Sequence, residues 1–433
     1  MAEIKPFRAW RYNIDLSKNI DKLTSPLFDV VSEKQRHNLY KNPYNSIHIS
    51  VPLGEDPAAN ASKTLNKWKS EGIIVQDPIP GIYVYYQYFT LAGTHKEFCR
   101  KGFIANIKAY DWDENVVLRH ENTIPQSVND RIDLLAATEL NVSPTHGLYT
   151  DPDFELDYIM DEAIKHPLYD SEDYQGVRDV LGVIHDATLI RKFIKVLEDK
   201  QIILADGHHR YEGSLAYKKY RMEQEPDNSG NEGYHYHLMF FSNTDSKDLR
   251  ILPTHRLVQK FKNFDKEFFL DKVSEYFTIK NVDNINDLTE IILGKKWAFG
   301  LILNNEAYKI RLKPEVLGQL TWNFPELIKE RDLTVLHFFI FEKILGIKGK
   351  DQRTTEHINY TRDFMECYTK VITNEAQLAI ITQDLSMDEI KEVCYSGYLL
   401  PQKSTYFYPK IICGFLFSSI KQDEFQSIPY SCF

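Results

Sequence analysis

Eight consecutive residues, Ala205 to Glu212, place an aspartate, a glycine, two histidines and an arginine between an apolar run and a helical pattern. The apolar run at residues 201–205 predicts a short buried strand, and the residues that follow repeat apolar side chains at helical spacing. At a turn from strand to helix, Asp206 can cap the helix and Gly207 can adopt a positive φ angle. The segment therefore predicts a turn whose free backbone N–H groups can face a ligand.

The first helical turn of this segment carries three side chains suited to an anion, namely His208, His209 and Arg210. The N-terminus of a helix is the positive end of its dipole, so cationic side chains there are unfavourable unless an anion or a carboxylate compensates them. Phosphate is the natural ligand of such a helix start. The plainer alternative is a surface turn with a good N-cap and an exposed histidine pair.

Composition and charge exclude several classes of function. The chain has 433 residues and a formal net charge of −10, which gives no overall electrostatic basis for binding nucleic acid or an anionic membrane. The N-terminus lacks the apolar core of a signal peptide, and no apolar stretch approaches the ~18 residues needed to cross a bilayer. The five cysteines show no C-x-x-C spacing, as expected for reduced structural thiols. We therefore expect a cytoplasmic protein that meets anions only at a local site.

A second group of candidate residues lies near the C-terminus, in the segment 401–410. Lys403, Ser404 and Thr405 place a cation beside two hydroxyl groups, and such a group can hold phosphate. The segment is not a P-loop, because the glycines whose N–H groups would surround the phosphates are missing. The alternative is a polar entry into the apolar strand expected at residues 411–416.

A third group comprises His120 and Glu121, with Arg131 ten residues after Glu121. Glu121 could act as a general base or hold magnesium, and His120 could donate a hydrogen bond to a phosphoryl oxygen. Asp29 is a further candidate base near the N-terminus. Taken as bare residues, all of these could be ordinary polar groups of loops.

The order of predicted elements indicates an α+β protein, that is, a mixed α/β fold. We expect a phosphate-binding domain over residues 1–263 and a smaller α/β unit over residues 264–433, whose last strand region (401–416) packs back on the site. One long helix is predicted over residues 326–345. His235 and His237 fall on one face of a predicted strand and could bind a metal, but no third ligand is near them in sequence. Signatures of Rossmann, Walker A, zinc-protease and serine-hydrolase sites are absent.

The chain resembles the "domain of unknown function 1015" family through six blocks in the same order. These blocks are residues 5–9, 28–30, 119–123 with Arg131, 205–212, 253–256 and 401–410. The sequence departs from the family at Leu27 and Phe28, where Pro-Tyr is typical, so a role that needs a tyrosine hydroxyl there does not carry over.

The segment from Gly207 to Tyr211 is also similar to the signature of the ParB and sulfiredoxin superfamily, which includes free-serine kinases. This resemblance implies a ParB/sulfiredoxin-like mixed-sheet domain elaborated by insertions. It also implies that phosphate is held at the start of the helix. The sulfiredoxin cysteine is replaced by His208, which disfavours a sulfinic acid reductase.

These observations and resemblances lead us to expect a magnesium-dependent kinase that phosphorylates free L-serine or a similar hydroxyl metabolite. The donor could be ATP, ADP or pyrophosphate. The expected phosphate- and donor-binding residues are Gly207, His208, His209, Arg210, His120, Arg131, Lys403, Ser404 and Thr405. The expected catalytic carboxylates are Asp206, Glu121 and Asp29, of which Asp206 and Glu121 are also the expected magnesium ligands.

Two other functions remain open at this point. One is a nucleotide-dependent, ParB-like binding or switch module, although the acidic balance leaves DNA contact without an electrostatic source. The other is a phosphohydrolase that uses the same phosphate site but admits water. Neither nucleic acid nor membrane is an expected partner, and the sequence leaves the oligomeric state open, a homo-oligomer included.

Overall fold

The computed structural model of the chain describes residues 2–91, 93–123, 125–401 and 403–425. The chain forms two compact units. The first comprises Met1–Arg119, Thr123–Leu249 and Pro409–Phe433, and the second comprises His120–Asn122 and Arg250–Tyr408. The functional division into a phosphate-binding domain over residues 1–263 and a smaller unit over 264–433 stays a prediction.

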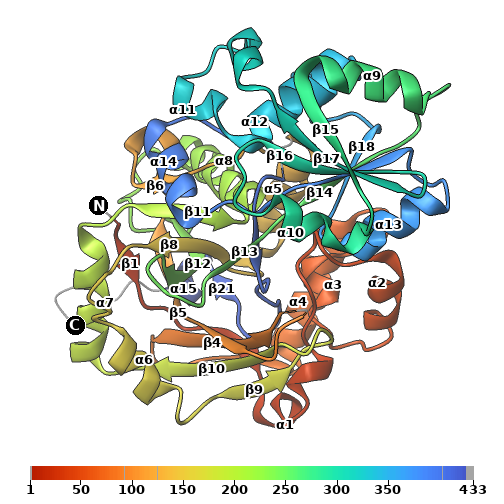
Figure 1. Ribbon diagram of the computed structural model, residues 1–433. Helices are drawn as coiled ribbons and strands as arrows, with labels where there is room; N and C mark the ends of the chain where they lie inside the picture. The colour runs from red at the N-terminus through yellow and green to blue at the C-terminus, as the bar shows by residue number, and fades with distance from the viewer. Residues whose placement is uncertain (1, 92, 124, 402, 426–433) are drawn as a thin grey trace. The chain divides into compact units, whose positions relative to one another are not determined.

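The first unit is built on a nine-stranded mixed sheet (Figure 1). Along the sheet the order is β6 (Val117–Leu118), β11 (Ile202–Asp206), β8 (Thr145–Tyr149), β12 (Tyr236–Asn243), β5 (Glu97–Lys108), β4 (Ile82–Thr90), β10 (Arg178–Ile184) and β9 (Tyr169–Glu172), with β1 (Ile4–Lys5) paired to β5. The pairs β11–β6 and β12–β8 are parallel, and the other pairs are antiparallel. This mixture of helices with a mixed sheet confirms the expected α+β class.

Both faces of this sheet are buried, because the long strands carry apolar or aromatic residues at successive positions. One core contains residues of α7 (Ala187–Glu198) and α8 (His208–Gln224), and the other contains residues of α4 (Pro57–Ser70) and α5 (Pro125–Thr138). The remaining strands and α-helices of the unit are β2 (Trp10–Tyr12), α1 (Ile14–Ser17), α2 (Glu33–Leu39), α3 (Ile47–Ser50), β3 (Ile74–Gln76), β7 (Leu140–Asn141), α6 (Asp157–Ala163), β21 (Ser418–Ser419) and α15 (Gln422–Phe425).

The second unit contains a six-stranded antiparallel sheet. Its order is β15 (Phe277–Val282), β17 (Glu306–Leu312), β16 (Ala298–Leu303), β19 (Leu378–Ile381), β14 (His255–Val258) and β18 (Ile358–Thr361). A separate pair joins β13 (Arg250–Leu252) to β20 (Tyr406–Tyr408). The α-helices are α9 (Lys266–Tyr276), α10 (Leu288–Ile292), α11 (Glu326–Lys329), α12 (Asp332–Leu336), α13 (Phe364–Ile372) and α14 (Met387–Ser396), and His337–Ile344 form a π-helix.

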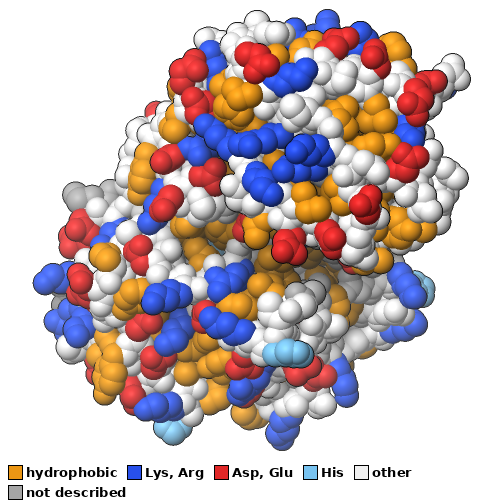
Figure 2. All heavy atoms as spheres, in the orientation of Figure 1, with side chains coloured by type: hydrophobic (Ala, Val, Ile, Leu, Met, Phe, Trp, Pro, Cys, Tyr) orange, Lys and Arg blue, Asp and Glu red, His pale blue; other side chains and the backbone are white. Residues whose placement is uncertain are grey.

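Positive charge gathers on one part of this second sheet, although the chain is acidic overall. Lys280 and Lys309 lie directly opposite each other on β15 and β17. Burial and the neighbouring charges of Lys295, Lys280 and Arg311 lower the pKa of Lys309. Figure 2 shows a group of Lys and Arg side chains in the upper half of the view, where Figure 1 labels β16 and β17. Like charges placed opposite each other on a sheet cost stability.

Two expected elements differ from the structure. The apolar run 411–416 is not a strand: it makes a single bridge, Ser25 to Cys413, and the chain turns at Gly414 with φ of +108°. The helix expected over residues 326–345 is interrupted near Arg331, where α11 ends and α12 begins. The interruption has a tertiary cause, since Asp332 Oδ1 accepts a hydrogen bond from the backbone N–H of Trp297 at 2.8 Å.

A buried polar network anchors the segment that follows Pro409 in the first unit. Gln87 Nε2 donates both to Asp179 Oδ1 at 2.8 Å and to the carbonyl oxygen of Lys410 at 3.1 Å. Tyr85 donates its hydroxyl to the same Asp179 oxygen at 2.5 Å. Burial raises the pKa of Asp179 to about 7, although the hydrogen bonds from Tyr85 and Gln87 oppose the rise. The network fixes the backbone at Lys410, a residue that contacts the Asp206 turn.

Candidate functional site

The predicted strand-to-helix turn is present. Strand β11 ends at Asp206, Gly207 has φ of +89°, and α8 begins at His208. A Cβ atom on Gly207 would lie 2.6 Å from Thr145 Cγ2 and 2.9 Å from Arg210 Nη2. Both the left-handed backbone and the crowding therefore require glycine at this position. His208 is buried in the first turn of the helix, and His209 is half-buried.

Asp206 does not cap α8 as the sequence suggested, because its carboxylate binds two cations instead. Oδ2 accepts a hydrogen bond from Arg210 Nη2 at 2.9 Å, and Oδ1 accepts one from Lys410 Nζ. Charge-assisted hydrogen bonds of this kind are stronger than a neutral cap. Burial acts to raise the pKa of Asp206, but the charges of Lys410 and Arg210 outweigh it and hold the pKa well below its usual range. Asp206 is therefore an ionised residue that positions two cations.

Replacing Asp206 with asparagine should destabilise the protein by about 3 kcal/mol at pH 7, because the buried Arg210 and the partly buried Lys410 lose their counter-charge. The effect should depend on pH. Since the folded-state pKa of Asp206 is depressed, its stabilisation is present above the unfolded pKa of about 3.9 and is lost as the pH falls below it. Urea unfolding of both proteins at pH 7, 4 and 3 measures the difference. A difference that stays constant over this range would contradict the ionised pair.

Arg210 connects the start of α8 to the loop between β7 and β8. It is buried, and its Nη1 donates to Ser143 Oγ at 3.0 Å and to the carbonyl oxygen of Pro144 at 2.6 Å. Together with its bond to Asp206, Arg210 makes three hydrogen bonds to neighbouring groups of the protein. Arg210 therefore holds the turn in place in addition to supplying charge.

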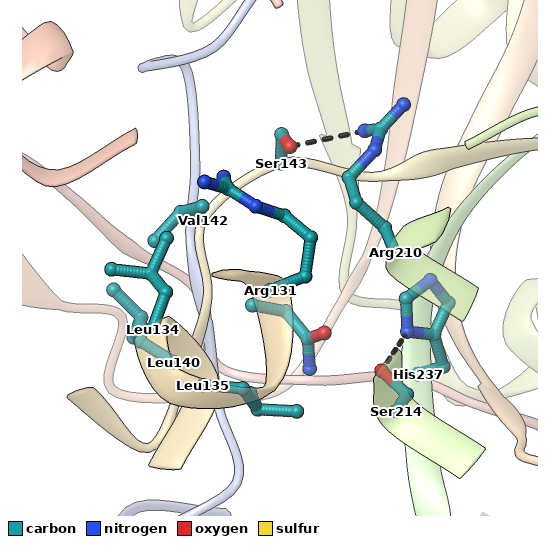
Figure 3. A pocket seen from close by; sticks show the side chains of 10 residues that line it. Arg131, Leu134, Leu135, Leu140, Val142, Ser143, Arg210, Ser214 and His237 are labelled. Carbon is teal, nitrogen blue, oxygen red and sulfur yellow. Dashed lines mark hydrogen bonds between the residues drawn. The ribbon is translucent and has the colours of Figure 1, made fainter. Parts of the chain in front are cut away.

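Arg210 lines a small pocket, and a second arginine, Arg131 of α5, lines it too (Figure 3). The pocket has a volume of about 40 Å³ and is lined by Arg131, Arg210, Ser143, Ser214, His237 and several apolar side chains. Burial lowers the pKa of Arg131, and the positive charge of Arg210 lowers it further. Asp206 already compensates the charge of Arg210, so an anion in this pocket would chiefly meet the charge of Arg131, which is half-buried.

Arg131 also reaches a larger groove of about 820 Å³ between α4 and α5. Its guanidinium lies 4.4 Å from the centre of the Phe28 ring, and Nη1 donates to the carbonyl oxygen of Ser50 at 3.1 Å. Asp29, the next residue after Phe28, is exposed in a turn and stabilises the charge of Arg131. The candidate base Asp29 and the two arginines are therefore brought together in the first unit.

The two histidines of the 234–241 region do not form the expected pair. His235 belongs to a short 3-10 helix and lies before β12, so it shares no strand face with His237. His237 is buried between Ser214 Oγ at 2.7 Å and Thr145 Oγ1 at 3.1 Å. Burial, with a smaller effect from Arg210, lowers its pKa to about 3, so it is neutral. Among the residues described by the structure, no group of three His, Cys, Asp or Glu side chains is arranged to hold a metal.

The other sequence-predicted residues lie in the second unit. His120 Nε2 and Thr405 Oγ1 are 2.8 Å apart, and the N–H of Leu400 donates to the carbonyl oxygen of His120 at 2.8 Å. Ser404 is buried and donates its hydroxyl to the carbonyl oxygen of Pro401. The members of the second unit are therefore His120, Glu121, Lys403, Ser404 and Thr405. The members of the first unit are Asp29, Arg131, Asp206, Gly207, His208, His209 and Arg210.

Two residues of the first-unit site were not predicted from the sequence. Lys410 belongs to one of the six blocks, but nothing in its local sequence links it to Asp206, 204 residues away. Ser143 lies in a loop with no recognisable motif. Only the fold brings these residues to the turn.

Comparison with known proteins identifies the family. Residues 4–335 match the family described as "Protein of unknown function (DUF1015)". The chain belongs to this family. No curated protein matches the sequence.

Solved structures similar to this chain include three of low identity. A conserved hypothetical protein from Pyrococcus furiosus matches with a TM-score of 0.37 and 11% identity, over 75% of this chain and 97% of that chain. A mutant free serine kinase in complex with AMP matches with a TM-score of 0.39 and 12% identity, over 75% and 94%. C-terminally truncated SbnI from Staphylococcus aureus matches with a TM-score of 0.37 and 11% identity, over 76% and 92%. At these scores the likeness says nothing about the site.

None of the described helices combines the length and the apolar character that a bilayer crossing demands.

Proposed function

We propose that this protein is a small-molecule phosphotransferase that transfers a phosphoryl group to the hydroxyl of free L-serine or a similar metabolite. The observation that carries the proposal is the pair of arginines, the half-buried Arg131 and the buried Arg210, which line one pocket beside the start of α8. A helix N-terminus with two guanidinium groups is suited to the phosphates of a nucleotide or of pyrophosphate. The motif resemblance to free-serine kinases supports a hydroxyl acceptor.

The residues of the turn have distinct roles in this proposal. The N–H groups of His208 and His209, together with Arg131, bind the donor phosphates. Arg210 holds the loop at Ser143 and adds charge, and Asp206 keeps Lys410 beside the turn. Phosphoryl transfer needs mainly positioning and positive charge around the moving group, which this arrangement supplies.

Asp29 is the base that we favour for the acceptor hydroxyl, because it lies beside Arg131 in the same unit. The hydroxyl oxygen attacks the terminal phosphorus as the bond from that phosphorus to the bridging oxygen of the donor breaks. The hydroxyl proton passes to the Asp29 carboxylate. Glu121, in the second unit, remains the alternative base.

The side chains around Asp206 do not form a ready magnesium site, since both carboxylate oxygens already bind cations. Magnesium in proteins is often held by one or two carboxylates plus the phosphates of a substrate. We therefore propose that magnesium enters bound to the donor phosphates and is not held by Asp206.

Phosphorus NMR tests this function. The full-length protein is incubated with magnesium, one of ATP, ADP or pyrophosphate, and a panel of hydroxyl metabolites that includes L-serine. A new phosphomonoester signal is expected with at least one donor and acceptor. Release of orthophosphate alone would favour the phosphohydrolase, and no turnover with any pair would contradict both enzymes.

The role of the base is tested with Asp29→Asn, which should lower the transfer rate by about 10²–10⁴-fold, the usual contribution of a general base. The matched control is Asp15→Asn, because Asp15 is an exposed carboxylate of the same unit. A transfer rate for Asp29→Asn equal to that of the control would remove Asp29 from the mechanism.

A further inference from the structure

The second unit contains a pocket of its own, with a volume of about 510 Å³. Trp322, Phe324 and Tyr360 supply aromatic walls, and the exposed side chains of Lys350 and Arg353 supply positive charge at the rim. The volume lies within the range typical of small-molecule sites, and a mostly apolar wall with a few polar groups is their usual lining. All the residues that line it belong to the second unit, whereas the Asp206 turn belongs to the first.

One residue that lines this pocket comes from an unusual helix. His337–Ile344 is a π-helix, and His337, its first residue, lines the pocket. A π-helical turn is rare because it disrupts the regular hydrogen bonding of an α-helix, and such turns recur at functional sites. A π-helix here is therefore a second, independent indication of a binding site.

The hydrogen bonds around His337 determine which of its ring nitrogens carries the proton. Gln352 Nε2 donates to the carbonyl oxygens of His337 at 3.0 Å and Ile347 at 2.8 Å, which fixes the orientation of the amide. Gln352 Oε1 therefore faces His337 Nδ1, at 2.9 Å, and Nδ1 must donate to it. The other nitrogen, Nε2, is left as a buried acceptor with no partner among the described residues.

His337 stays neutral in this environment. It is 2% exposed, and its burial, together with the positive charge of Arg256, lowers its pKa to about 3. A buried acceptor without a donor is unfavourable, and a ligand carrying an N–H group would satisfy it. The pocket therefore favours a ligand with a hydrogen-bond donor on a flat, largely apolar body.

The aromatic wall is fixed before any ligand arrives. Trp322 Nε1 donates to Glu342 Oε2 at 3.0 Å, and the N–H of Gly349 donates to the same oxygen at 2.7 Å. A Cβ atom on Gly349 would lie 2.8 Å from Trp322 Cζ2, so the backbone packs directly against the indole ring. The rings of Trp322 and Phe324 meet edge to face, with centroids 5.8 Å apart. Such a rigid aromatic wall can stack on a flat heterocycle at little cost in entropy.

We propose that this pocket binds a purine nucleotide. The base stacks on the aromatic wall and donates an N–H group to His337 Nε2, and the phosphate is held by Lys350 and Arg353. Purines combine a flat heterocycle with N–H donors, and a nucleotide adds an anion that the two exposed cations of the rim can bind. The inference rests on residues of the second unit alone and does not depend on the proposed kinase activity.

Tryptophan fluorescence and calorimetry on the full-length protein test this site with AMP, adenosine and ribose 5-phosphate as probes. AMP is expected to quench the emission of Trp322 and to bind at least tenfold more tightly than either fragment. The double variant Lys350→Ala/Arg353→Ala should lose about tenfold or more of the AMP affinity but keep its affinity for adenosine. The matched control is Lys348→Ala, since Lys348 is exposed in the same loop and does not line the pocket.

Further variants separate this site from the Asp206 turn and from a folding defect. Trp322→Phe should abolish the AMP-dependent fluorescence change, whereas Arg131→Ala should leave it intact. Equal AMP binding by the double variant and the Lys348→Ala control would overturn the proposal, as would loss of the Trp322 signal in Arg131→Ala. His337→Phe should weaken adenosine binding. If this variant fails to fold, the exposed Lys350 and Arg353 substitutions still decide the question.

Discussion

Replacing Arg131 with alanine is expected to weaken donor binding by about 10- to 150-fold, which corresponds to the 1.5–3 kcal/mol of one charge-assisted hydrogen bond. The structural reason is that Arg131 lines both the small pocket beside α8 and the large groove between α4 and α5. Its removal also frees Arg210 from a like charge, so the fold should not lose stability through that pair. Calorimetric titration with ADP measures the change.

Two further variants make this result specific. Arg131→Lys keeps the charge but lacks the planar fork, so it should lie between the wild type and alanine. Arg178→Ala is the matched control, because Arg178 is a surface arginine of the same unit that pairs with Asp170. Donor affinity for Arg131→Ala equal to that of Arg178→Ala would mean that Arg131 does not bind the donor.

Replacing Gly207 with alanine is expected to abolish the activity and to lower stability by several kcal/mol. The left-handed backbone costs an alanine about 1–2 kcal/mol. The new Cβ atom would also lie 2.6 Å from Thr145 Cγ2 and 2.9 Å from Arg210 Nη2, so the strand and the arginine must both move. Thermal unfolding and the transfer assay report the two effects separately.

The control for this substitution is Gly230→Ala. Gly230 has a similar φ of +77°, but a Cβ atom there would meet nothing within 4 Å. The Gly230→Ala variant should therefore lose only the stability that the left-handed backbone costs an alanine, and it should keep full activity. If both variants lost equal stability and both remained active, the crowding around Gly207 would have no functional consequence.

The turn at Asp206 could be predicted from the sequence because its determinants are local. An apolar run, an aspartate, a glycine and a helical repeat lie within a few residues, and this order specifies a strand-to-helix turn wherever the strand is buried. The observed elements β11 and α8 begin and end close to the predicted positions. The mixed α/β class followed from the alternation of such local patterns along the chain.

The role of Asp206 could not be predicted, because it depends on a partner that is distant in sequence. An aspartate before a helix most often caps it, but Lys410 and Arg210 compete for both oxygens in the folded chain. The break near Arg331 has a similar origin. Asp332 binds the N–H of Trp297, a contact between residues 35 positions apart that local helix propensity does not contain.

Which candidate residues lie in the same unit could not be predicted from the sequence either. His120 to Asn122 belong to the second unit although the residues on both sides belong to the first, and residues from Pro409 onward return to the first unit. The His120–Thr405 contact and the Asp206–Lys410 pair both join residues more than 200 positions apart. The resemblance to a family pointed to the candidate residues, whereas only the fold shows which of them are neighbours.

In the proposed function, the start of α8 and Arg131 hold the phosphates of the donor. A crystal structure of the full-length protein with a non-hydrolysable ATP analogue tests it most directly. We predict phosphate oxygens within hydrogen-bond distance of the backbone N–H groups of His208 and His209 and of the Arg131 guanidinium. Phosphates bound only elsewhere, for example beside Lys350 and Arg353 with the Asp206 turn empty, would contradict the account.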